Sequence, residues 1–183
     1  WTWGDNSYGQ LGCGSLREKK RACPAKVVFP AASVPDSMVE QVFAGWNHCI
    51  AIRKPDVLAW GRGDFGQLGD GGREQKVPTP TMAHMNGSVR LPTSPNILQL
   101  TQPQTVVSFA VGSEHCLAVT ADESGSRLLA WGWNDHGQLG VGDEANRYEP
   151  TIVSLPSDLK PTQVFAGNGG QSFAVCMDEV AAA

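Results

Sequence analysis

Hydrophobic residues along the chain fall into short runs separated by glycines. One kind of run is apolar, rich in β-branched residues, and ends at a glycine; it spans Val39 to Ala44, Thr105 to Val111 and Thr162 to Ala166. The run that follows alternates polar and apolar residues, at His48 to Arg53, His115 to Thr120 and Ser172 to Met177. The first pattern predicts a buried inner strand, and the second predicts a half-buried neighbouring strand.

A third strand is predicted at Val57 to Trp60 and at Leu128 to Trp131, each ending in a Trp-Gly pair. The pair opens a ten-residue pattern, W-G-x-x-x-x-G-Q-L-G, which also begins at Trp3. We expect the indole to fill space between neighbouring units, the leucine to be buried, and the glycines to permit tight turns. We assign this structural role to Trp3, Gly4, Gly9, Leu11, Gly45, His48, Trp60, Gly61, Gly66, Leu68, Gly112, His115, Trp131, Gly132, Gly137, Leu139 and Gly167.

The copies are unequally spaced, which indicates a fixed four-stranded unit with variable loops. Such a unit cannot bury its apolar face alone, so the pattern predicts an all-β fold, a β-propeller of four-stranded blades. The blade units are a half blade at 1–37, blades at 38–104 and 105–161, and a half blade at 162–183, about three blade equivalents in one domain. The proline-rich insert from Val77 to Pro103 is expected to form an extended loop.

Composition narrows the function classes. A net charge of −4 provides no general attraction for nucleic acid, and no apolar stretch is long enough for a membrane-spanning helix. The five cysteines form no CxxC pair, and their odd number argues against a secreted disulfide framework. We therefore expect a cytoplasmic protein, or one shared with the nucleus.

Two His-Cys pairs, His48-Cys49 and His115-Cys116, have residue types that zinc prefers. We expect them instead to be structural, because equivalent positions in successive blades should stand a blade width apart and neighbours on a strand point to opposite faces. The chain has no G-x-S-x-G elbow and no GxxxxGK[ST] loop. The sequence thus predicts no catalytic residue, no cofactor and no metal.

Candidates for binding another protein are the polar and aromatic residues Trp46, Trp133, Asn134, Asp135 and His136. Tryptophan is enriched at binding hot spots, although within a blade it also serves in packing. A basic cluster at Arg17, Lys19, Lys20 and Arg21 is expected in a solvated loop, with an acidic partner as the functional alternative.

The repeated segments resemble those of the regulator of chromosome condensation superfamily, in which seven blades usually close a ring. Within it, the chain is most similar to the secretion-regulating guanine nucleotide exchange factors and the fungal killer-toxin-insensitivity propellers. The residues that carry this likeness are Gly45 to His48, Trp60 to Gly69, Gly112 to His115, Trp131 to Gly137 and Glu144 to Asn146. The chain begins at a third strand and stops after a second. We therefore expect it to be the C-terminal part of a longer propeller whose remaining blades complete the ring.

The resemblance implies a non-enzymatic protein that binds another protein. One implied partner is a small zinc-containing electron carrier, with a role in diphthamide synthesis and Elongator-dependent tRNA modification. The alternatives are a guanine nucleotide exchange factor for a small Ras-like GTPase and a propeller module of a larger multidomain protein. No exchange-factor residue of the family could be matched to a position of this sequence.

Overall fold

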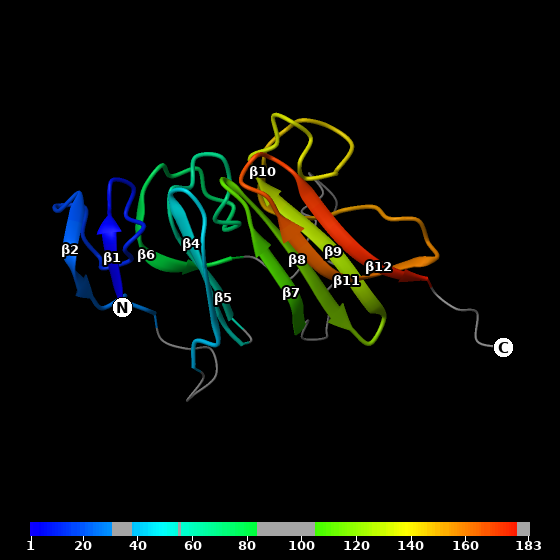
Figure 1. Ribbon diagram of the computed structural model, residues 1–183, viewed down its shortest axis with the longest axis horizontal. Coiled ribbons are helices and arrows are strands. Elements are labelled where there is room, and N and C mark those ends of the chain that lie inside the picture. Colours follow the sequence, from blue (N-terminus) through cyan, green and yellow to red (C-terminus); the bar gives the residue numbers. More distant parts are fainter. Residues whose placement is uncertain (31–37, 55, 84–104, 179–183) are drawn as a thin grey trace, which may run out of the picture.

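The computed structural model describes residues 1–30, 38–54, 56–83 and 105–178 and contains four antiparallel β-sheets that follow one another along the molecule (Figure 1). The N-terminal pair consists of β1 (Thr2–Asp5) and β2 (Lys20–Ala25). The first blade consists of β3 (Gln41–Ala44), β4 (His48–Arg53), β5 (Asp56–Gly61) and β6 (Val77–Met82). The second blade consists of β7 (Thr105–Val111), β8 (His115–Asp122), β9 (Gly125–Gly132) and β10 (Arg147–Ile152). The C-terminal pair consists of β11 (Leu159–Ala166) and β12 (Ser172–Asp178).

The two complete blades repeat one strand register. In the first blade His48 lies opposite Gly61 and Cys49 opposite Trp60, and in the second blade His115 and Cys116 lie opposite Gly132 and Trp131. Strands are hydrogen-bonded in chain order within each blade. The predicted all-β class with four-stranded blades is confirmed, with two complete blades and two strand pairs in the described residues.

The second and third strands form the buried centre of each blade. Every residue of β5 is buried, and β4 is buried except at Cys49. The sequence predicted that the first strand of each blade is buried. This prediction is wrong for β3, which is less buried than β4 and β5 of the same blade. The reason is its place at the edge of the sheet, where it has a neighbouring strand on one side.

Adjacent blades pack through aromatic rings. Trp131, fully buried, lies in a cluster with Ile50 and Leu68 of the preceding blade, and its ring is 5.5 Å from Phe109 in an edge-on contact. Phe109 in turn is 5.3 Å from Phe43 of the first blade. Burial of such large apolar side chains is the main stabilising contribution available at a blade junction.

Two segments expected to be loops are strands. Val77–Met82 forms β6 despite Pro78 and Pro80, because an edge strand tolerates prolines whose missing N–H groups would face away from the sheet. Lys20 and Arg21 begin β2 rather than lying in a loop. The rest of the proline-rich insert, residues 84–104, lies outside the described residues. No helix in the described part of the chain is long and apolar enough to cross a membrane.

Candidate protein-binding face

The turns at one end of the blades form a continuous surface, which we call the loop face. It comprises residues 45–47, 62–76, 112–114 and 133–146, which connect β3 to β4, β5 to β6, β7 to β8 and β9 to β10. These turns lie together because alternate connections of an antiparallel sheet fall at the same end. They stand along the upper edge of the molecule in Figure 1. The backbone N–H of Trp46 donates to Ser113 O (3.0 Å), which joins the two blades here.

Glu114 is the buried carboxylate at the centre of the loop face, with 4% of its surface exposed. It belongs to the second blade, but its oxygens accept hydrogen bonds from three side chains of the first. Gln67 Nε2 donates to Oε2 (2.6 Å), while Asn47 Nδ2 (3.1 Å) and Arg62 Nη1 (3.3 Å) donate to Oε1. A buried carboxylate with three donors is well compensated for its lost hydration, and it fixes one blade against the next.

Arg62 is held rigidly at the surface beside Glu114. Its guanidinium forms two hydrogen bonds to Asp64 (2.7 and 3.0 Å), and these bonds are the largest cause of its raised pKa. The same group lies 4.4 Å from the ring centre of Phe65 and 5.2 Å from that of Tyr8. Planar stacking and a bidentate carboxylate are favourable for arginine, so this cation is fixed in one orientation while partly accessible.

His48 lies beneath this surface and is fully buried. Burial and, to a smaller extent, the nearby His115 together lower its pKa to about 3, so the imidazole is neutral at pH 7. Its Nδ1 lies 3.9 Å from Glu114 Oε2, too far for a hydrogen bond, and its neutral form makes no ion pair there. The ring rests on Gly45, where a Cβ atom would collide with it. His48 therefore holds the turn.

The two His-Cys pairs are closer together than the predicted separation of one blade width. His48 Nε2 lies 3.5 Å from Cys116 Sγ of the next blade, whereas Cys49 points the other way and donates to Gln10 O (3.4 Å). Burial raises the pKa of Cys49 to about 11 and that of Cys116 well above its usual value, so both thiols stay protonated. Among the described residues no group of three or more His, Cys, Asp or Glu side chains could hold a metal ion.

The predicted binding residues take different positions. Trp46 is 66% exposed. Trp133 is half-buried and meets the exposed ring of His136 edge-on at 5.0 Å, next to the exposed Asp135. Trp46 and Trp133 flank one turn, because the N–H of Trp133 donates to Glu114 O (2.9 Å) as that of Trp46 does to Ser113 O.

Asn134 is fully buried, so its side chain does not face a partner. Its Nδ2 donates to Asp143 O (2.8 Å) and Ala145 O (3.1 Å), and its Oδ1 accepts from Leu139 N (2.9 Å). Asn6 makes the same kind of contacts in the first copy of the pattern, to Ser15, Glu18 and Leu11. The asparagine shapes the loop that presents its neighbours.

Sequence reasoning missed the residues that organise the loop face, chiefly Glu114 and Arg62. A usable signal is present in the ten-residue pattern, where Tyr8, Phe65 and His136 share one position. A ring at the same place in every copy indicates a row of surface aromatics. Arg73, which lies 4.1 Å from the ring centre of Tyr148, adds a second stacked cation.

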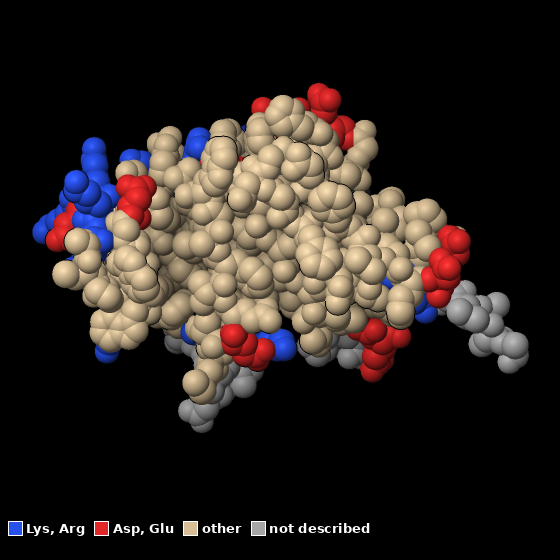
Figure 2. All heavy atoms as spheres, in the orientation of Figure 1, with Lys and Arg blue, Asp and Glu red and all other residues tan. Residues whose placement is uncertain are grey.

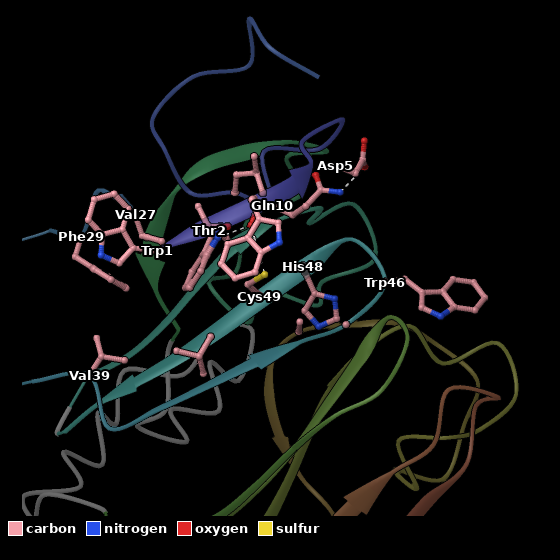
Figure 3. Close-up of a pocket in the computed structure, with 16 residues that line it drawn as sticks. Trp1, Thr2, Asp5, Gln10, Val27, Phe29, Val39, Trp46, His48 and Cys49 are labelled. Carbon is pink, nitrogen blue, oxygen red and sulfur yellow. Dashed lines mark hydrogen bonds between the residues drawn. The ribbon is translucent and has the colours of Figure 1, made fainter. Parts of the chain in front are cut away.

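A hollow of about 550 Å³ lies between the N-terminal pair and the first blade (Figure 3). Its walls are largely apolar and include Trp1, Trp3, Val42, Cys49 and Trp60. Trp46 borders it and projects to one side, so the hollow adjoins the loop face. The hollow is therefore part of the junction between the N-terminal pair and the first blade.

Charge is unevenly distributed over the molecular surface. In Figure 2 the Lys and Arg side chains gather at the end formed by the N-terminal pair. Arg17, Lys19 and Lys20 are exposed there, and Arg21 pairs with Glu18 at 3.1 Å. Between the charged ends the surface visible in Figure 2 is mostly uncharged.

Repeated four-stranded blades joined side by side define the class as a β-propeller segment. The family model described as "Regulator of chromosome condensation (RCC1) repeat" matches residues 1–52, 56–119 and 126–175. The chain belongs to the RCC1 repeat family.

Similar proteins include the secretion-regulating guanine nucleotide exchange factor of Mus musculus, 33% identical over 96% of this chain and 36% of that protein. The ultraviolet-B receptor UVR8 of Arabidopsis thaliana is 30% identical over 90% of this chain and 32% of its own length. The E3 ubiquitin-protein ligase HERC2 of Homo sapiens is 30% identical over 92% of this chain and 4% of its own length. The chain thus spans about a third of the first two relatives.

Solved structures agree on the fold. Human WBSCR16 has a TM-score of 0.67 at 25% identity, covering 96% of this chain and 39% of that one. Prp20p of Saccharomyces cerevisiae, described with its binding to Gsp1p and histones, has a TM-score of 0.67 at 22% identity, covering 95% and 38%. These coverages correspond to about three blades of an RCC1 propeller.

Proposed function

We propose that the chain is the protein-binding part of an RCC1 propeller that promotes nucleotide exchange on a small Ras-like GTPase, with the loop face as the contact surface. The observation that carries the proposal is the rigid loop face itself. Glu114 ties two blades together below it, Arg62 is held in place above, and the ring of Trp46 is exposed beside them. Similarity to the secretion-regulating guanine nucleotide exchange factor supports this partner class.

The physical chemistry of the loop face favours binding over catalysis. An exposed tryptophan buries a large area with little loss of conformational entropy, and a preorganised arginine contacts carboxylates or phosphates without first being ordered. The thiols of Cys49 and Cys116 are held in their unreactive protonated form. The surface therefore acts by contact with a partner.

The proposal is tested by nucleotide release. Fluorescent GDP is loaded on a panel of Ras-like GTPases, and its release is followed with and without the protein. We expect faster release from at least one GTPase, with the effect reduced at least about tenfold by Trp46→Ala, the loss expected at a hot spot. Val107→Ala, at a residue 56% exposed on the edge strand β7, is the control and should keep the effect.

Unchanged release across the panel, together with no GTPase binding, would overturn the proposal. Recovery of a small cysteine-rich zinc protein in its place would favour the other family role, support of diphthamide synthesis and tRNA modification. No contact described above favours that role. We propose that the protein is located in the cytoplasm or is shared between the cytoplasm and the nucleus. The five free cysteines support this location, because both compartments are reducing.

A further inference from the structure

The loop between β5 and β6, residues 62–76, extends a cation to the unit on either side of it. Lys76 Nζ lies 5.6 Å from the ring centre of Tyr8, in the loop of the N-terminal pair. The guanidinium carbon of Arg73 lies 4.1 Å from the ring centre of Tyr148, in β10 of the second blade. These are the two tyrosines of the chain, and each holds a cation of this one loop.

The two tyrosine rings are themselves held in place. The hydroxyl of Tyr148 donates to Asp64 O at 3.3 Å, which ties the ring to the loop of the first blade. The backbone N–H of Tyr8 donates to Gln10 Oε1 (2.9 Å), and the guanidinium of Arg62 lies 5.2 Å from the ring centre. Both rings are half-buried. The cations therefore rest on rings of fixed orientation, which lowers the entropic cost of binding through them.

The charges of Arg73 and Lys76 are not neutralised by the described part of the chain. Both side chains are exposed, and no described carboxylate pairs with either of them. Arg62 of the same loop differs, because Asp64 and Glu114 both pair with it. Arg62 thus supports the loop face from within, while the N–H donors of Arg73 and Lys76 are available to a partner.

The two cations lie inside the row of blades. Their loop has a described neighbour on each side, the loop of the N-terminal pair and the outer strand of the second blade. Gly14 N donates to Pro78 O and Gly71 N donates to Tyr148 O, each at 2.9 Å, and these bonds hold both neighbours against the first blade. The exposure of the cations therefore does not arise at either end of the row.

The surroundings of the two cations favour an acidic protein segment over nucleic acid. Proteins that bind single strands stack bases on open aromatic faces, but here a cation of the chain already lies over each tyrosine. The net charge of −4 and the exposed Glu74, between the two cations in sequence, also disfavour a polyanion with a charge on every unit. Two separate carboxylates match two separate cations.

We propose that Arg73 and Lys76, which we call the cationic site, bind two acidic side chains of the partner protein, one on each side of the loop. The inference rests on the proposed protein-binding function and names the chemistry of the partner segment. Stacking on Tyr148 occupies a face of the Arg73 guanidinium, so the N–H groups in its plane donate to the first carboxylate. The ammonium of Lys76 donates to the second carboxylate beside Tyr8.

Fluorescence anisotropy of a labelled acidic peptide tests the proposal. The peptide has about ten residues, with glutamate alternating with glycine or serine, and is long enough to cross the loop at about 3.3 Å per residue. The control ligand has glutamine in place of every glutamate. We expect saturable binding of the acidic peptide that weakens with salt, and at least about tenfold weaker binding of the neutral one. Equal binding of both peptides, or none of the acidic one, would overturn the proposal.

A thymidine oligonucleotide of the same total charge is the third ligand. We expect it to bind more weakly than the acidic peptide, because the tyrosine faces are covered and the charges of the cationic site are separate. Tighter binding of the oligonucleotide would overturn the proposal and assign the surface to nucleic acid.

Three variants locate the binding of the acidic peptide. Arg73→Gln and Lys76→Gln each remove one charge from the cationic site, while Lys54→Gln removes one from the turn between β4 and β5, at the opposite end of the blade. We expect the first two to weaken binding about fivefold or more, and the control to change it less than about twofold. The same loss in all three variants would mean a general attraction between charges and would overturn the assignment.

Failure here is distinguishable from failure of the exchange function. If no GTPase responds, but the acidic peptide binds and Arg73→Gln weakens it, the cationic site stands and the partner class is wrong. If exchange is accelerated, but Arg73→Gln and Lys76→Gln bind the peptide as the parent protein does, the exchange function stands and the cationic site is wrong.

Discussion

His48 Nε2 lies 3.5 Å from Cys116 Sγ, although the two residues belong to different blades and are 68 positions apart. The thiol also donates to Gln67 O, at 3.6 Å, and Trp131 Nε1 donates to the same oxygen at 3.2 Å. One carbonyl of the Gly-Gln-Leu-Gly turn therefore receives two donors from the next blade. The histidine completes a polar contact buried at the junction.

The next junction repeats this arrangement with a different residue. His115 Nε2 lies 3.1 Å from Ser172 Oγ, and that hydroxyl donates to Gln138 O at 2.6 Å. Serine thus replaces cysteine while the geometry is kept. The repeated contact fixes each strand pair against its neighbour, which explains how blades with variable loops keep one relative orientation.

Burial of the two histidines predicts a stability that falls in mild acid. The pKa of His48 is lowered to about 3 and that of His115 is also lowered, both chiefly by burial. Because the unfolded histidines titrate near pH 6.5, the unfolded state binds more protons below that pH. The free energy of unfolding should be level above pH 7 and should drop by about 2 kcal/mol for His48 alone at pH 5.

Urea unfolding at pH 7.5, 6.0 and 5.0 measures this fall. His48→Gln is the matched variant, because Gln171 stands at the equivalent place in the C-terminal pair. It should remove about 2 kcal/mol of the difference between pH 7.5 and pH 5.0, which is the share of His48, and leave the share of His115. An unchanged pH dependence in the variant would mean that His48 is not the titrating group.

Gly69 and Gly142 offer a pair of substitutions that separates backbone strain from a side-chain clash. Their φ angles are +67° and +91°, so alanine is strained at each by about 1 kcal/mol. A Cβ at Gly69 would also lie 2.8 Å from Trp131 Nε1, while at Gly142 it would meet no atom of the described residues within 4 Å. We expect Gly69→Ala to be less stable than Gly142→Ala by about 2 kcal/mol in urea unfolding. Equal losses would show that the indole moves freely.

The fold was predictable because its determinants are local. The ten-residue pattern carries the turn glycines, the buried leucine and the indole in fixed order, so each unit can be recognised from its own short stretch of sequence. The strand β6 was missed because Pro78 and Pro80 were interpreted as loop residues, and their tolerance depends on being at a sheet edge.

The loop face was less predictable, because its contacts join different units. Glu114 meets Arg62 and Gln67 across a junction, and the sequence does not specify which turns of successive blades approach each other. The burial of Asn134, a predicted binding residue, is hard to predict for a related reason. Its buried position follows from a loop that closes over it, and the loop length varies between copies.

Removal of the Glu114 carboxylate should loosen the first blade from the second. Glu114→Ala removes the acceptor of the buried Gln67 amide and one of the carboxylates that Arg62 contacts. We therefore expect the free energy of unfolding, measured in urea, to fall by about 3 kcal/mol. Glu40→Ala is the control, because the ion pair of Glu40 with Lys54 is solvent-exposed and should contribute at most about 0.5 kcal/mol. Similar losses in both variants would show that Glu114 does not join the blades.

A comparison of substitutions at Trp46 and Trp60 distinguishes a role in binding from a role in packing. The tryptophan side chain is 66% exposed at position 46 and 2% exposed at position 60. Trp60 donates to Gln10 O at 2.8 Å and meets Phe29 edge-on at 5.9 Å. Trp60→Ala removes these contacts between the N-terminal pair and the first blade, so it should lower the free energy of unfolding by about 4 kcal/mol. Trp46→Ala removes a projecting ring and should change the free energy of unfolding by less than about 0.5 kcal/mol. Urea unfolding of both variants checks this difference. A destabilised Trp46→Ala would assign that ring to the fold, and any loss of GTPase binding in this variant would then reflect unfolding instead of a lost contact.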